Sequence, residues 1–188
     1  ATEGDLSHTR GHVWGAGLSI RKQTWIDLQR HHFPALCTGI KGRRFSRGED
    51  TEVCLAARVL GWKIWYSPRL ELEHRLALNR VTWGHVRKLC RWGGIATAHH
   101  QPYRILWRER TTATKVRIPP RKRRLKEAFL ALTQFPLKVY RDFIFNRAGN
   151  TRVLEFESKL GQFLGQLAFG KQLESLVRQL RIHFLEIP

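Results

Sequence analysis

Apolar residues recur at helical spacing in several stretches of the chain. Within residues 51–60, Val53, Ala56, Ala57 and Leu60 follow the i, i+3, i+4, i+7 pattern, which places them on one face of a helix. Gly61 then stands where a glycine commonly ends a helix. The same spacing predicts further helices over residues 23–29, 80–93, 125–145 with a kink at Pro136, and 151–184.

Extended segments are predicted in the first part of the chain. Residues 70–74 alternate between apolar and polar positions, and residues 62–67 form a short aromatic run. Residues 12–21 read as a strand interrupted at Gly15 and Gly17, where the missing side chains let a second backbone or a ligand approach closely. Strands that alternate with helices are typical of an α/β layer.

These patterns predict three parts of the chain. We expect an α/β sheet domain over residues 1–76. Residues 77–114 should hold a basic aromatic helix and a connection, and residues 115–188 a basic amphipathic helical tail.

Positive charge is concentrated in the helical part. The 188 residues carry a net charge of +19. Residues 1–76 hold 12 Lys and Arg against 8 Asp and Glu, whereas residues 77–188 hold 22 against 7. Such an excess of positive charge predicts an anionic partner, and three interpretations of the tail stay open. In the first, the tail lies on an anionic membrane; in the second, it binds nucleic acid through the basic run at 121–124. In the third, its apolar stripe packs only on its own domain.

Cysteine usage and hydropathy narrow the location. Cys37, Cys54 and Cys90 show no CxxC spacing, which argues against a disulfide framework and a structural zinc site. Reduced thiols suit the cytoplasm, and no apolar run approaches the ~18 residues of a membrane span. We expect a cytoplasmic protein, peripheral at the inner face of the plasma membrane. Because the chain opens at Ala1 and contains no methionine, we read it as a fragment or a processed chain.

An acidic pair stands out in this basic chain. Glu49 and Asp50 follow Gly48 and directly precede the helical pattern of residues 51–60. Acidic residues favour the first turn of a helix, where they face free backbone N–H groups. The pair therefore marks a helix start, and a carboxylate held there is also suited to act as a general base.

The order of several motifs resembles the acceptor-side half of a family 2 glycosyltransferase with the GT-A fold. "WGAGLSIRK" (residues 14–22) is similar to that family's glycine-containing strand, and "SRGEDTEVCLAARVLGWKIWYSPRLELEH" (residues 46–74) to its acid-led helix, strand and trailing histidine. "NRVTWGHVRKLCRWGG" (residues 79–94) resembles the basic aromatic helix of one bacterial branch. The resemblance implies the C-terminal part of a GT-A sheet domain followed by helices.

The resemblance also implies a reaction. Asp50 would be the catalytic base that takes the proton from an acceptor hydroxyl, with Glu49 in support and Gly48 giving room for the acceptor. The transfer would invert the anomeric carbon of a nucleotide-diphospho-sugar, and the acceptor would be a saccharide or a lipid-linked hydroxyl. A non-enzymatic basic helical module that binds nucleic acid or an anionic membrane is the alternative.

Further residues receive roles from the same resemblance. His74 would lie near a divalent cation (Mn²⁺ or Mg²⁺), or else it simply ends a strand. Arg80, Trp83 and Arg87 would contact the diphosphate, or else form a solvated basic face. Trp62 would stack on a sugar or nucleobase ring, or else belong to the core.

One feature of the family is missing from the sequence. The chain contains no Asp-X-Asp motif, whose carboxylates hold the cation against the diphosphate. We therefore expect the cation to be held mostly by a missing N-terminal half, and this chain alone to be inactive.

Overall fold

The protein is mainly helical in its computed structural model, which describes residues 2–37, 39–41, 44–45 and 47–185. The helices are α1 (Lys22–Arg30), α2 (Glu49–Val59), η1 (Leu78–Arg80), α3 (Trp83–Thr112), α4 (Arg121–Thr133), α5 (Leu137–Ile144), α6 (Thr151–Phe169) and α7 (Leu173–Phe184). The strands are β1 (Gly4–Asp5), β2 (Ile40–Lys41), β3 (Arg44–Phe45) and β4 (Trp65–Tyr66).

The expected α/β sheet is absent from the described part of the chain. β1 pairs antiparallel with β4, so that Gly4 lies opposite Tyr66, and β2 pairs antiparallel with β3. Residues 12–21, which contain a turn at 15–17, and residues 70–74 form no strand and pair with no other segment that the structure describes. An extended segment becomes a strand only when a neighbour accepts its backbone hydrogen bonds. The α/β prediction is therefore wrong, and the resemblance to a GT-A sheet domain is corrected with it.

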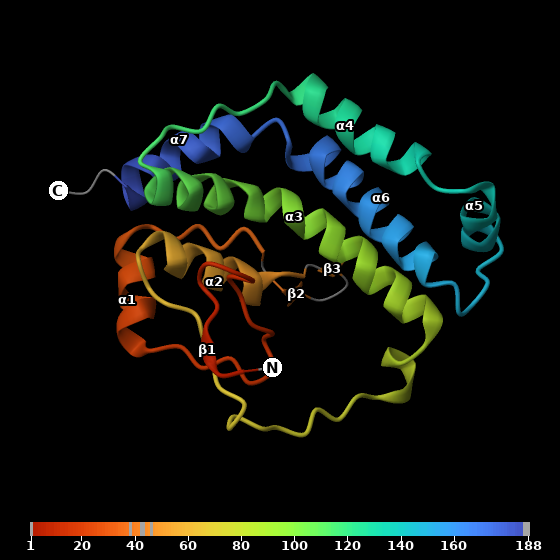
Figure 1. Ribbon diagram of the computed structural model, residues 1–188, viewed down its shortest axis with the longest axis horizontal. Coiled ribbons are helices and arrows are strands. Elements are labelled where there is room, and N and C mark those ends of the chain that lie inside the picture. Colours follow the sequence, from red (N-terminus) through yellow and green to blue (C-terminus); the bar gives the residue numbers. More distant parts are fainter. Residues whose placement is uncertain (1, 38, 42–43, 46, 186–188) are drawn as a thin grey trace.

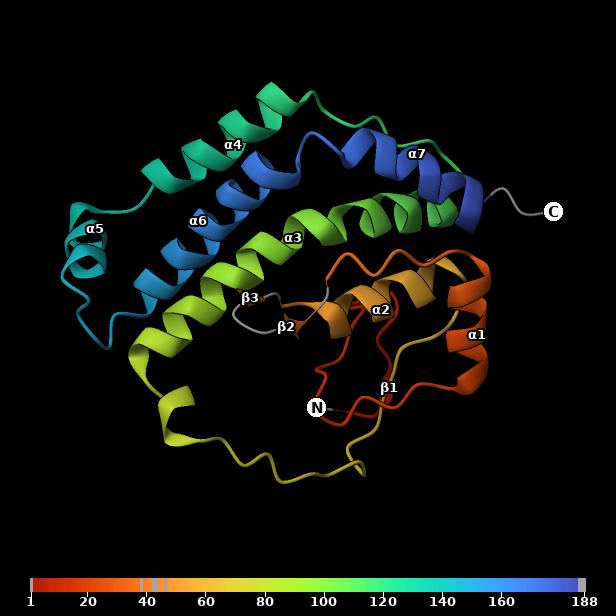
Figure 2. The ribbon, with the colours of Figure 1, turned by 180° about the vertical axis from the view of Figure 1, so that it is seen from behind.

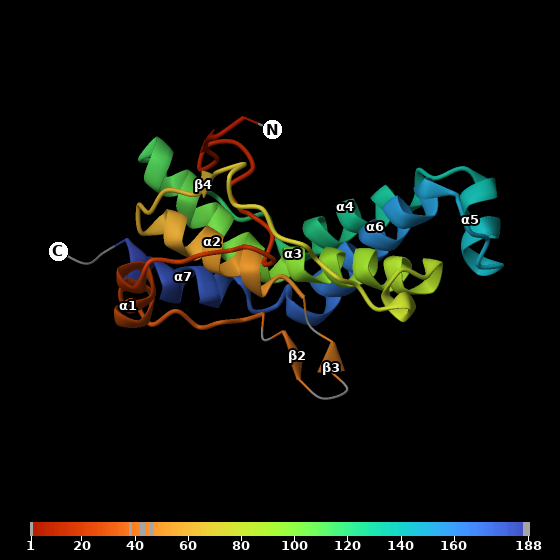
Figure 3. The same cartoon turned by 90° about the horizontal axis from the view of Figure 1, so that it is seen from below.

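Helix α3 is the central element of the molecule. Figure 1 shows α1 and α2 on one side of α3, with α6 and α7 along its other side. Helix α4 lies on α6, and α5 closes the far end, which is also clear from behind in Figure 2. Seen from below, the β2–β3 hairpin projects from the helical body (Figure 3).

Two groups of buried side chains hold these helices together. The first joins α1, α2, α3 and α7 and includes Leu28, Tyr103, Leu106 and Val177. The second lies at the α5 end, where Val139, Val153 and Phe156 pack with the half-buried Trp83. Because α3 contributes to both groups, it ties the first part of the chain to the C-terminal helices.

Glycines bring α3 and α6 into close contact. Gly94 of α3 faces the backbone of Ser158 and Gly161, and Gly161 of α6 faces the backbone of Arg91. A Cβ atom on either glycine would lie well inside the van der Waals contact distance of a carbonyl oxygen on the other helix. The two backbones can approach this closely only because both positions lack a side chain.

The helical predictions hold with changed boundaries. α1 and α2 match the predicted 23–29 and 51–60, whereas α3 continues to Thr112 through Pro102. The kinked helix predicted over 125–145 is two helices, because Pro136 caps the start of α5. Gly170 likewise ends α6 before α7 begins. None of the described helices combines the length and the apolar character that a membrane span requires.

Candidate carboxylate site at the start of α2

Asp50 lies in the first turn of α2 and is held by backbone N–H groups. The N–H of Gly15 donates to Asp50 Oδ2 at 2.7 Å, and the N–H of Thr51 donates to Asp50 Oδ1 at 2.7 Å. Among the described residues, no Lys, Arg or His nitrogen forms an ion pair with this carboxylate. Its charge is thus stabilised by aligned N–H groups and the positive end of α2, without a cation.

A cavity of about 550 Å³ opens beside this carboxylate. Its floor is the start of α2, and its walls come from the Gly15 segment, α1 and the segment before β2. The lining residues are Gly15, Leu18, Trp25, Phe33, Ala35, Cys37, Glu49, Asp50, Glu52 and Val53. Carboxylates and aromatic side chains therefore face the same space, and Trp25 is 43 % exposed.

Glu49 and Asp50 also begin a helix, as the helix-start reading predicted, because α2 starts at Glu49. Glu49 is exposed and lines the cavity, so both acids of the pair face it. Gly15 lies against Asp50, and the Cα of Gly17 faces Leu72. The structure therefore joins Gly15, Glu49 and Asp50 in one site.

Gly48 faces the interior of the protein. Its φ of 102° favours glycine, and a Cβ atom there would meet the His100 ring at 2.8 Å and Ala96 at 2.9 Å. The His100 Nε2–H donates to the Gly48 carbonyl at 2.9 Å. Burial lowers the pKa of His100 to about 4, so this imidazole is neutral at pH 7. The resemblance implied that an acceptor would lie beside Gly48. In the structure, His100 and Ala96 of α3 fill this space.

Below the Asp50 turn lies Glu52, a fully buried carboxylate that the sequence interpretation missed. It accepts the N–H of Leu36 at 2.8 Å, the N–H of Cys37 at 2.6 Å and the hydroxyl of Tyr103 at 2.9 Å. Burial raises its pKa despite these hydrogen bonds. Glu52 stands four residues before the buried Ala56, and this spacing was the signal that places it on the inner face of α2.

We expect this buried carboxylate to make stability fall as pH rises. Because its pKa is higher in the folded protein, the folded state binds more protons than the unfolded chain between the ordinary glutamate pKa and the raised one. Unfolding free energy should therefore decrease with rising pH across that window. Urea unfolding of Glu52→Gln should show a smaller decrease, although the variant is less stable throughout because its amide cannot accept the Cys37 N–H. An equally steep decrease in the variant would contradict this assignment.

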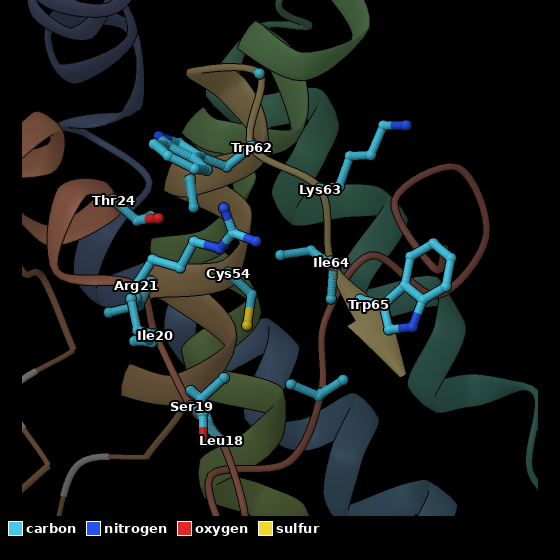
Figure 4. A pocket seen from close by; sticks show the side chains of 14 residues that line it. Leu18, Ser19, Ile20, Arg21, Thr24, Cys54, Trp62, Lys63, Ile64 and Trp65 are labelled. Carbon is cyan, nitrogen blue, oxygen red and sulfur yellow. The ribbon is translucent and has the colours of Figure 1, made fainter. Parts of the chain in front are cut away.

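Trp62 lines a different cavity of about 510 Å³, shown in Figure 4. This cavity lies on the other side of Leu18 and Val53, two residues that line both cavities. The Trp62 side chain is half-buried at its wall, so it is neither fully in the core nor beside Asp50.

The three predicted diphosphate contacts lie away from Asp50. Arg80 is exposed in η1, and Trp83 packs in the second buried group. Arg87 pairs with α6, where its Nε lies 2.7 Å from Glu157 Oε1, and its guanidinium lies 4.6 Å from the centre of the Phe143 ring in α5. The structure therefore separates these residues from the Asp50 cavity and gives Arg87 a structural role.

His74 does not belong to a metal cluster in the part of the chain that the structure describes. It is exposed in the irregular segment between β4 and η1. No group of three or more His, Cys, Asp or Glu side chains among the described residues could hold a metal ion. The described residues do not fit a divalent cation site of their own.

Comparison with protein-family models, with curated proteins and with solved structures gives no match. The family 2 resemblance therefore receives no support from these comparisons, and the helical fold argues against it. The case for a function depends on the geometry of the Asp50 cavity.

Proposed function

We propose that the Asp50 cavity binds a hydroxyl-rich acceptor, such as a saccharide, and that Asp50 acts there as the general base of an inverting glycosyl transfer. The observation that carries the proposal is the carboxylate itself. The Asp50 carboxylate lies beside a cavity, is fixed in direction by the N–H of Gly15, and has no competing ion pair among the described residues.

The chemistry of the lining suits such an acceptor. Carboxylate oxygens accept hydrogen bonds from hydroxyl groups, and the exposed face of Trp25 offers an apolar platform for a sugar ring. Glu49 would hold a second hydroxyl and keep the acceptor in register. A cavity of about 550 Å³ lies within the size range of small-molecule sites.

In the proposed step, Asp50 takes the proton from one acceptor hydroxyl. The oxygen attacks the anomeric carbon of a nucleotide-diphospho-sugar, and the bond from that carbon to the diphosphate breaks with its electron pair. General-base help of this kind contributes about 10²–10⁴-fold to a rate. In this proposal the described residues form the acceptor side of the reaction.

Asp50→Asn is the test of this proposal. We expect turnover to fall at least about 100-fold because the amide cannot take the proton, while acceptor binding is retained because the amide oxygen can still accept the Gly15 N–H. Release of nucleoside diphosphate should be followed in the full protein that carries this sequence, with Glu71→Gln as an exposed acidic control outside the cavity. Turnover of Asp50→Asn at the rate of the control would remove Asp50 from the mechanism.

A second proposed property is attachment to an anionic membrane surface, and it depends on α5. Leu137, Ile144 and Phe145 are 86 %, 71 % and 68 % exposed, and Lys138 and Arg141 lie between them on this short helix. Residues 121–150 hold eight basic and two acidic residues. Exposed apolar side chains beside cations are typical of helices that lie in the interface of an anionic bilayer. We refer to these five side chains as the α5 surface.

Vesicle sedimentation tests the α5 surface. The protein should sediment with phosphatidylcholine vesicles that contain phosphatidylglycerol, less with pure phosphatidylcholine, and less at high salt. The triple variant Leu137→Ser, Ile144→Ser, Phe145→Ser should lose this binding. Leu78→Ser, which removes an equally exposed leucine (86 %) outside α5, should keep it. Equal binding of both variants would contradict the proposal, and tighter binding to RNA than to vesicles would favour nucleic acid.

A further inference from the structure

The cavity of about 510 Å³ in Figure 4 has one charged end and one apolar wall. It lies between the segment that leads into α1, the side of α2, and the segment that runs into β4. The lining residues are Val13, Leu18, Ser19, Ile20, Arg21, Thr24, Val53, Cys54, Ala57, Gly61, Trp62, Lys63, Ile64 and Trp65. No acidic residue is among them, so the cavity is suited to a negatively charged ligand.

The charged end is the N-terminus of α1. Arg21 precedes the helix, no side chain caps its first N–H groups, and its first turn contains no acidic residue. The free N–H groups and the helix dipole together favour an anion at this point. Among the described residues, no carboxylate forms an ion pair or a hydrogen bond with the Arg21 guanidinium.

Thr24 is a second, independent indication of a ligand. The residue is only 6 % exposed, and its hydroxyl has no hydrogen-bond partner among the described residues, although a hydroxyl in the first turn of a helix commonly finds a nearby carbonyl. Figure 4 shows the Thr24 hydroxyl and the Arg21 guanidinium pointing from the α1 end toward the cavity. The hydroxyl oxygen itself is not fully closed off from the cavity, so a bound oxyanion can accept its hydrogen bond.

The rest of the cavity is apolar and contains an aromatic ring. Figure 4 shows the Trp62 indole on the same side as Arg21 and Thr24. Val53, Cys54 and Ala57 of α2 line the apolar wall of the cavity. Lys63 and Trp65 point outward at the rim. A ligand whose flat apolar body lies against this wall would therefore place an attached anionic group at the α1 end.

We propose that this cavity binds a small ligand that carries an oxyanion, a phosphate or a carboxylate, on an apolar ring. The oxyanion accepts hydrogen bonds from the first N–H groups of α1, from the Thr24 hydroxyl and from the Arg21 guanidinium. The ring packs against Trp62 and the α2 wall. This site is separate from the Asp50 carboxylate, which would repel an anion, and it does not require the proposed transfer reaction.

Titration calorimetry with four probes tests both halves of the site: phenyl phosphate, benzoate, phenol and inorganic phosphate. Phenyl phosphate or benzoate should bind at least about tenfold more tightly than phenol and than inorganic phosphate, since a charged hydrogen-bonded group contributes more than about 1.4 kcal/mol. The affinities for phenyl phosphate and benzoate then show which oxyanion the site prefers. Phenol binding as tightly as either anion, inorganic phosphate binding as tightly as phenyl phosphate, or no probe binding, would each overturn the proposal.

Two variants locate the binding at the α1 end. Arg21→Gln should weaken the preferred anionic probe roughly tenfold, and Thr24→Val, which keeps the side-chain shape, about three- to tenfold. Arg30→Gln removes an arginine from the last turn of the same helix and should leave the affinity unchanged. Circular dichroism should show that all three variants keep the helical fold. Equal affinities of Arg21→Gln and Arg30→Gln would overturn the assignment.

Discussion

Replacing Gly94 by alanine should destabilise the protein by about 2–4 kcal/mol, whereas the same change at the neighbouring Gly93 should stabilise it by up to about 1 kcal/mol. Both glycines lie within α3, so both changes gain the same intrinsic helix propensity. A Cβ atom at Gly93 would meet nothing within 4 Å. A Cβ atom at Gly94 would run into the Ser158 carbonyl oxygen and the backbone of Gly161.

The large effect at Gly94 follows from the kind of atom that is met. A flexible side chain could turn away from an added methyl group, but backbone atoms inside a helix cannot move without the whole helix. α3 and α6 would therefore have to separate along their contact, which loosens the packing of both helices.

Urea unfolding of the two variants, followed by circular dichroism, measures this difference directly. Because both variants gain the same helix propensity, the difference between the two unfolding free energies reports mainly the helix contact. A Gly94→Ala variant as stable as Gly93→Ala would show that α3 and α6 are further apart than the structure places them.

Replacing Glu157 by alanine should destabilise the protein by about 3–5 kcal/mol, the range for removing one partner of a buried ion pair. Glu157 is fully buried, and Arg87 and Arg91 of α3 both bind it. Arg87 Nε lies 2.7 Å from Oε1, and Arg91 Nε lies 2.6 Å from Oε2. Without this carboxylate, the Arg87 side chain, which is 11 % exposed, would keep a buried charge without its counter-ion.

Two controls separate the lost ion pair from a general effect of mutating α6. Glu155→Ala removes an exposed glutamate two residues earlier and should change stability by less than about 0.5 kcal/mol. The double variant Arg87→Leu, Glu157→Leu removes the uncompensated charge and should recover part of the loss. Thermal or urea unfolding that shows equal stability for Glu157→Ala and Glu155→Ala would contradict the buried ion pair.

The Glu157 result also bears on the interpretation of the basic helix. The sequence allowed Arg87 either a phosphate contact or a place on a solvated basic face. In the structure Arg87 instead pairs with Glu157, which stands 70 residues further along the chain. A spacing rule within one helix cannot detect a carboxylate that arrives from another helix.

The position of Asp50 shows how far local patterns reach. The acidic pair after a glycine correctly indicated the start of α2, because acids are favoured in the first turn for local electrostatic reasons. That the Gly15 N–H, 35 residues earlier, holds its carboxylate beside a cavity could not be read from spacing. The motif order suggested proximity only through a family resemblance, and the sheet of that family is absent from the described residues.

The sequence by itself indicated which stretches of this protein are helical, although it missed the second half of α3 and the breaks between α4 and α5 and between α6 and α7. Helices are specified locally, because their backbone hydrogen bonds close within four residues and their apolar faces follow a fixed period. Only the tertiary structure decided the rest. Residues 12–21 and 70–74 find no strand partners among the described residues, and Gly94 and Gly161 bring α3 and α6 together. The Asp50 and Glu157 carboxylates bind an N–H group and arginines from distant segments. Strand pairing, helix contacts and buried ion pairs all join residues far apart in the chain, and no local pattern encodes such a partner.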